Sequence, residues 1–109
     1  MSEQRTLQAR KGNTFGFDMR MKNPDGTPIN LTGHAMELVI GLGGGDTFRK
    51  DFTIDNAAAG QLSIHLSVEE VDAFEVRRHP FEIIHTAAGE VRTIVIGYFL
   101  VTQWVGADA

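Results

Sequence analysis

The most regular stretch of the chain covers residues 15–22 and reads Phe15-Gly16-Phe17-Asp18-Met19-Arg20-Met21-Lys22. Apolar and polar residues alternate along it, and this period of two places successive side chains on opposite faces of a β-strand. The four apolar side chains therefore share one face, which another layer of structure must cover. The stretch predicts a half-buried strand.

Working outward, further alternating stretches occur at residues 34–42, 47–54, 61–66, 80–86 and 91–105. Turn-forming residues separate them, most clearly at residues 23–28, where Pro24 presets φ and Gly26 can adopt a positive φ. Residues 5–8 form either a short opening strand or part of an extended arm over residues 1–12. Ser67 and Glu70 have the spacing of a capping box, which predicts a helix of one or two turns ending near Phe74.

These elements predict an all-β chain, specifically an immunoglobulin-like antiparallel β-sandwich of about seven strands with one short helical turn. A small closed barrel is the alternative architecture. The 109 residues are enough for one domain, residues 1–109, with one core.

Composition excludes several classes of function. The sequence has no cysteine, no apolar run of membrane-helix length and no apolar stretch near its start that could act as a signal peptide. We therefore expect synthesis in a reducing cytoplasm. The formal charge of −4 gives no general attraction to nucleic acid or to an anionic membrane.

The stretch at 91–105 is unusual because it is apolar on both faces, whereas a sandwich strand needs only one buried face. Gly97 within it suggests a bulge that re-aims the strand. The second face is covered by the short helix, by the N-terminal arm or by another subunit. We predict a subunit interface there, formed by Arg92, Ile94, Ile96, Tyr98, Leu100 and Trp104.

Motifs for catalysis are missing from the sequence. Residues 41–46, Gly-Leu-Gly-Gly-Gly-Asp, superficially resemble a phosphate loop, but they lack the third glycine and the following helix of a dinucleotide fingerprint. No G-x-S-x-G elbow occurs. We therefore expect no catalytic activity and no cofactor.

The four histidines, at positions 34, 65, 79 and 85, have no local metal-binding spacing, so we expect no metal site; one assembled across strands is the remaining alternative. A carbohydrate-binding module that uses Tyr98 or Trp104 is the alternative to a structural role.

The order of the turn motifs carries a resemblance. Lys11-Gly12-Asn13-Thr14 opens a strand, Asp25-Gly26-Thr27-Pro28-Ile29-Asn30-Leu31-Thr32-Gly33 forms a loop, and Gly97 lies in a late strand that ends near Val101. This order resembles the small immunoglobulin-like structural proteins of tailed bacteriophages and prophages. The resemblance implies a non-catalytic virion component, of the baseplate, tail, neck or head-decoration type. It also implies that the chain packs against other virion proteins and against copies of itself.

Overall fold

The computed structural model describes residues 3–103. It contains mainly β-strands and one short helix, which confirms the all-β class. The elements in chain order are β1 (Glu3–Arg10), β2 (Phe15–Arg20), β3 (Ala35–Gly43), β4 (Asp46–Asp51), β5 (Thr53–Asn56), β6 (Gln61–Leu66), α1 (Val68–Asp72), β7 (Arg78–Ala87) and β8 (Glu90–Thr102).

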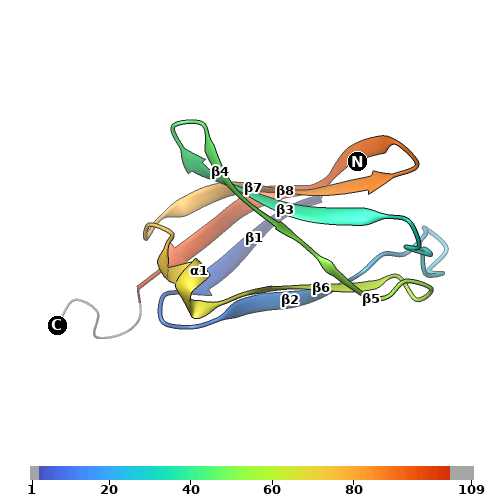
Figure 1. Cartoon of the computed structure of the whole chain (residues 1–109), viewed down its shortest axis with the longest axis horizontal. Helices are drawn as coiled ribbons and strands as arrows, with labels where there is room; N and C mark the ends of the chain where they lie inside the picture. Colours follow the sequence, from blue (N-terminus) through green and yellow to red (C-terminus); the bar gives the residue numbers. More distant parts are fainter. Residues whose placement is uncertain (1–2, 104–109) are drawn as a thin grey trace.

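The strands form two separate sheets that face each other, with α1 at one end of the space between them (Figure 1). The larger sheet has the strand order β1-β8-β7-β3-β4 and the smaller one has the order β2-β6-β5. The structure is therefore a sandwich, and the closed-barrel alternative is wrong. Both sheets and α1 contribute fully buried side chains to one core, among them Leu38, Leu62, Leu66, Val71 and Phe99.

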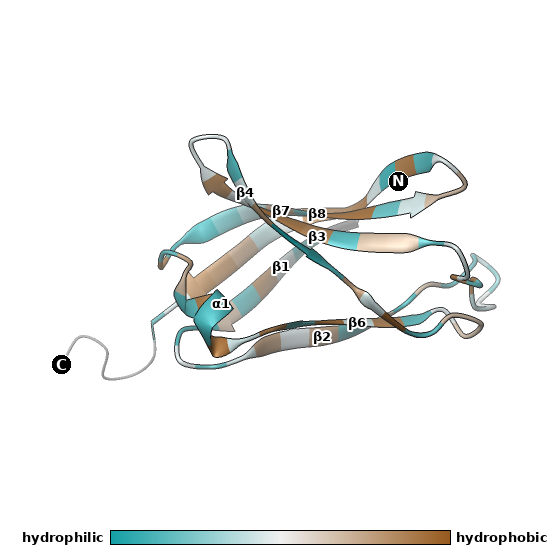
Figure 2. Cartoon of the chain, in the orientation of Figure 1, coloured by the Kyte–Doolittle hydropathy of each residue, from teal (hydrophilic) through white to brown (hydrophobic). Residues whose placement is uncertain are grey.

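The alternating stretch at residues 15–22 forms β2, which pairs with β6 in antiparallel register from Phe15↔Leu66 to Arg20↔Gln61. Its apolar side chains are half-buried and its polar side chains are exposed, as the alternation predicts. Brown and teal segments follow this pattern along the strands in Figure 2. The local sequence pattern therefore sets the orientation of the smaller sheet.

The strand predicted at residues 47–54 is divided between the two sheets. β4 belongs to the larger sheet and β5 to the smaller one, and Phe52 lies between them. The Phe52 side chain is 7% exposed and its N–H donates to the Met36 carbonyl at 2.9 Å. The chain thus crosses from one sheet to the other while it keeps an aromatic side chain in the core. Residues 3–103 contain eight strands for this reason, against about seven predicted.

Of the two alternatives for residues 5–8, the structure shows the strand. β1 lies beside β8 at one edge of the larger sheet and pairs with it in parallel, from Glu3↔Val95 to Arg10↔Thr102. Leu7 and Ala9 pack on the core. β1 therefore extends the sheet sideways and does not cover the second face of β8.

Gly97 has a different role from the predicted bulge. The register shift of β8 lies between Thr93 and Val95, opposite Ile83 and Ile84. At Gly97, a Cβ atom would meet the Arg5 carbonyl oxygen at 1.6 Å, so only glycine lets the β1 backbone approach this closely.

The predicted capping box is confirmed at the start of α1. The Ser67 hydroxyl accepts from the Glu70 N–H at 3.1 Å, and the Glu70 carboxylate accepts from the Ser67 N–H at 2.9 Å. Within residues 3–103 no helix has the length and apolar character that crossing a membrane requires.

Candidate functional site

The larger sheet has one face turned away from the smaller sheet, and strand register identifies its residues. Val95, Phe99 and Val101 of β8 are buried in the core, so Ile96, Tyr98 and Leu100 between them point to the opposite face. Ile96 is 41% exposed and Tyr98 is 42% exposed, although both side chains are large and apolar or aromatic.

The neighbouring strands extend this apolar area. Tyr98 pairs with Pro80, and Ile96 pairs with Glu82, which pairs in turn with Val39. Ile84 pairs with Glu37 on the same face. We name this area the outer patch; it consists of Val39, Pro80, Ile84, Ile96, Tyr98 and Leu100, which lie around the exposed Glu82.

Charged side chains border the outer patch. The guanidinium of Arg78 lies 5.2 Å from the centroid of the Tyr98 ring, in a cation–π contact. On the other side, Arg49 forms an ion pair of 2.8 Å with Glu37. Apolar side chains within a charged rim are the usual composition of a protein–protein contact, and here Glu82 adds one charge inside the rim.

The structure describes five of the six predicted interface residues and places them in two groups. Ile96, Tyr98 and Leu100 lie on the outer patch. The register shift between Thr93 and Val95 reverses the alternation, so Ile94 packs against the core. Arg92 pairs with His85, whose neighbour in register is the buried Met36, so Arg92 also lies on the inner side. Trp104 lies outside the described residues. A bulge depends on pairing with a distant strand, and the sequence of β8 alone gave no signal for its position.

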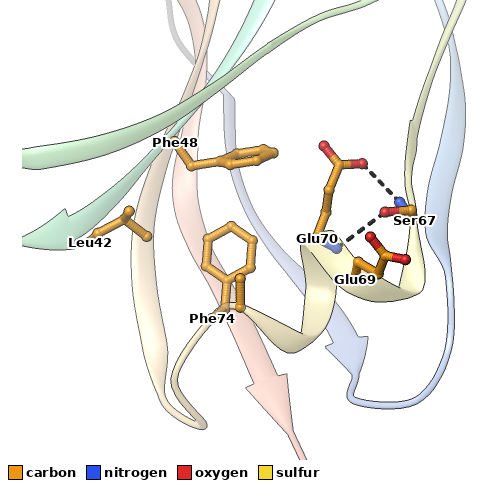
Figure 3. A pocket seen from close by; sticks show the side chains of 7 residues that line it. Leu42, Phe48, Ser67, Glu69, Glu70 and Phe74 are labelled. Carbon is orange, nitrogen blue, oxygen red and sulfur yellow. Dashed lines mark hydrogen bonds between the residues drawn. The ribbon is translucent and has the colours of Figure 1, made fainter.

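A hollow of about 310 Å³ lies beside α1 (Figure 3). Its apolar walls include Leu42, Phe48 and Phe74, and the two phenylalanine rings meet edge to face with their centroids 5.2 Å apart. Glu69 and Glu70 lie on its other side. The hollow can accept an apolar side chain.

The carboxylate of Glu70 is already used for structure. A hydrogen bond of 2.6 Å from the Lys50 ammonium, followed by the bond from the Ser67 N–H, lowers the pKa of Glu70 from its ordinary value. A general acid needs a raised pKa, so Glu70 is unsuited to that role. Lys50 instead ties α1 to β4, and Ser67 caps the start of the helix.

The four histidines occupy three different environments. His65 is exposed, as the alternation predicts. His79 is 1% exposed, with Nε2 at 2.9 Å from the Glu75 carbonyl oxygen. His34 and His85 are 51 positions apart in the sequence, but their rings lie together and form a hydrogen bond of 2.9 Å between His34 Nδ1 and His85 Nε2. Burial, followed by the nearby charges of His34 and Arg92, lowers the pKa of His85.

The pairing of His34 with His85 was not predictable from local spacing, because it depends on the register between β3 and β7. Among the residues that the structure describes, no group of three or more histidine, aspartate or glutamate side chains converges as metal ligands do.

Within residues 3–103 the chain is an all-β sandwich whose larger sheet exposes apolar side chains on its outer face. Among solved structures, the fold is similar to the N-terminal domain of phage TP901-1 ORF48, with a TM-score of 0.54 and 14% sequence identity. The similarity covers 88% of this chain and 83% of that chain. Neither a family model nor a curated protein matches the sequence. At this identity the likeness is one of fold.

Proposed function

We propose that this protein is a non-catalytic structural subunit of a phage or prophage virion, and that its outer patch packs against a neighbouring copy of the chain. The exposure of Ile96 and Tyr98 on β8, on the outer face of the larger sheet, carries the proposal. The similarity of the fold to a domain of a phage protein supports the assignment to a virion. The protein is made in the cytoplasm of the bacterial host and works in a head, neck or tail assembly.

Burial explains why the outer patch favours association. Removing apolar surface from water contributes about 25 cal/mol per Å², and the large exposed side chains of the patch supply that surface. Arg78 and Arg49 at the border keep the isolated chain hydrated there. The patch therefore suits a subunit that stays in solution until it meets its neighbour.

The edge strands offer a second kind of contact. β1 and β4 form the two edges of the larger sheet, and the outer side of each has no strand partner within residues 3–103. Backbone N–H and C=O groups at such edges can pair with a strand of an adjacent virion protein. Contacts through the patch and through the edges can thus be made at the same time.

The experiment compares Ile96→Glu with Val91→Glu by size-exclusion chromatography with light scattering. Both residues lie on β8, but Val91, which is 67% exposed, lies at the hairpin end beyond the outer patch. We expect the wild type to associate with increasing concentration, Ile96→Glu to remain monomeric at an unchanged melting temperature, and Val91→Glu to behave as the wild type.

A wild-type protein that stays monomeric, and does not co-purify with structural proteins encoded beside it, contradicts the proposal. The carbohydrate-binding alternative predicts hits on a glycan array that Tyr98→Ala abolishes. Arg78 already occupies one face of the Tyr98 ring, which leaves less of the ring for a sugar to stack on.

A further inference from the structure

His34 and His85, whose rings meet on the larger sheet, are each held in place by the backbone structure around them. His34 follows the turn at Gly33, whose φ is +80°, and its N–H donates to the Leu31 carbonyl at 2.9 Å. His85 lies within β7, between β3 and β8. The two rings therefore do not depend on a flexible segment for their proximity.

We propose that His34 and His85 form a two-imidazole binding site for a divalent transition-metal ion, Cu²⁺ or Ni²⁺ in preference to Zn²⁺. Imidazole nitrogens are the usual protein ligands for these ions. Water molecules complete the coordination in the isolated chain. The site lies on the inner side of the sheet, so it is independent of the outer patch and of the proposed function.

The distance between the two nitrogen atoms sets the preference among metals. His34 Nδ1 and His85 Nε2 are 2.9 Å apart. A metal ion at about 2.05 Å from each nitrogen would subtend an angle of about 90° between them. This is the angle between adjacent ligands in the tetragonal geometry of Cu²⁺ and Ni²⁺, whereas tetrahedral Zn²⁺ would need the nitrogens about 3.3 Å apart.

The surroundings of the two rings leave space for further ligands. A hollow of about 340 Å³ beside His85 is lined by Ala87, Ala88, Glu90 and Arg92, and it has room for water ligands. Arg92, at the wall of this hollow, forms an ion pair of 2.7 Å with Glu90.

The test is isothermal titration calorimetry of untagged protein with CuCl₂, NiCl₂ and ZnCl₂ at pH 7. We expect one metal ion per chain, with NiCl₂ bound more tightly than ZnCl₂. His34→Gln and His85→Gln should each weaken Ni²⁺ binding about tenfold or more, because a single imidazole loses the chelate. The matched control is His65→Gln, since His65 is exposed on the smaller sheet.

A second measurement distinguishes chelation from a hydrogen bond alone. Electron paramagnetic resonance of the Cu²⁺-loaded protein should show coupling to two imidazole nitrogens, reduced to one in either variant. Metal binding that survives in the double variant His34→Gln, His85→Gln overturns the proposal. A loss of binding in His65→Gln as large as the loss in the single variants of His34 and His85 overturns it too. The absence of saturable binding by the folded wild type also overturns it.

Discussion

Gly97 shows how one residue can determine whether an element docks. The side chain that any other residue would carry there points at the backbone of β1, at Arg5, and not into a core or into solvent. A sequence pattern can identify such a glycine as special. It cannot identify the reason, because the strand that approaches lies more than 90 positions earlier, as the pairing Arg5↔Gly97 shows.

Replacing Gly97 by alanine should detach or displace β1. We expect a loss of about 3 kcal/mol in the free energy of unfolding, at the upper end for an overpacked site. Amide hydrogen exchange of residues 5–10 should accelerate more than exchange in β6. The control is Ile96→Ala, one residue away but directed outward, which should change stability by less than about 1 kcal/mol. Unchanged protection of β1 in Gly97→Ala would contradict this role.

At the scale of elements, the divided strand around Phe52 joins the two layers. The Phe52 ring meets the Phe17 ring edge to face, with centroids 5.8 Å apart. Its backbone N–H bonds to β3 in the larger sheet, while the residues that follow pair with β6 in the smaller sheet. The crossing is thus held by one side chain and one backbone hydrogen bond together.

Phe52→Ala should therefore be strongly destabilising, by about 3–5 kcal/mol, the usual cost of truncating a buried phenylalanine. Phe48→Ala is the comparison, because Phe48 is only half-buried at the wall of the hollow beside α1 and should cost less. Urea denaturation of both variants, monitored by circular dichroism, measures the difference in their free energies of unfolding. An equal loss in the free energy of unfolding in the two variants would contradict the role of Phe52 in joining the two sheets.

Local features of the fold could be predicted from the sequence, and pairings between distant segments could not. The strand at β2, the turn near Gly26 and the cap at Ser67 depend on neighbouring residues, so their patterns were sufficient. The parallel docking of β1 and the meeting of His34 with His85 depend on which strands lie side by side. The outer patch could be predicted in part. Ile96, Tyr98 and Leu100 follow the alternation and lie on the patch, whereas the bulge turns Arg92 and Ile94 to the inner side.

At the scale of the whole molecule, the two sheets share one core. Phe15 of the smaller sheet meets Phe99 of the larger sheet at 5.2 Å between ring centroids, and Phe74 beyond α1 meets the same ring at 5.1 Å. Neither sheet can separate without exposing these rings to water. Small single cores of this kind usually unfold in one cooperative step.

We therefore expect thermal unfolding in a single transition, with the same midpoint in far-ultraviolet circular dichroism, which reports the strands, and in near-ultraviolet circular dichroism, which reports aromatic packing. Two separated midpoints would show that the smaller sheet melts independently of the larger one.

The parallel pairing of β1 with β8 also has a consequence for biosynthesis. The opening strand leaves the ribosome long before its partner, since Glu3 pairs with Val95 and Arg10 with Thr102. During that interval the nascent chain has an undocked N-terminal segment, and the sheet closes only when translation has passed β8. If two chains emerge close together, the segment of one can dock on β8 of the other, which is a direct route to an exchanged dimer.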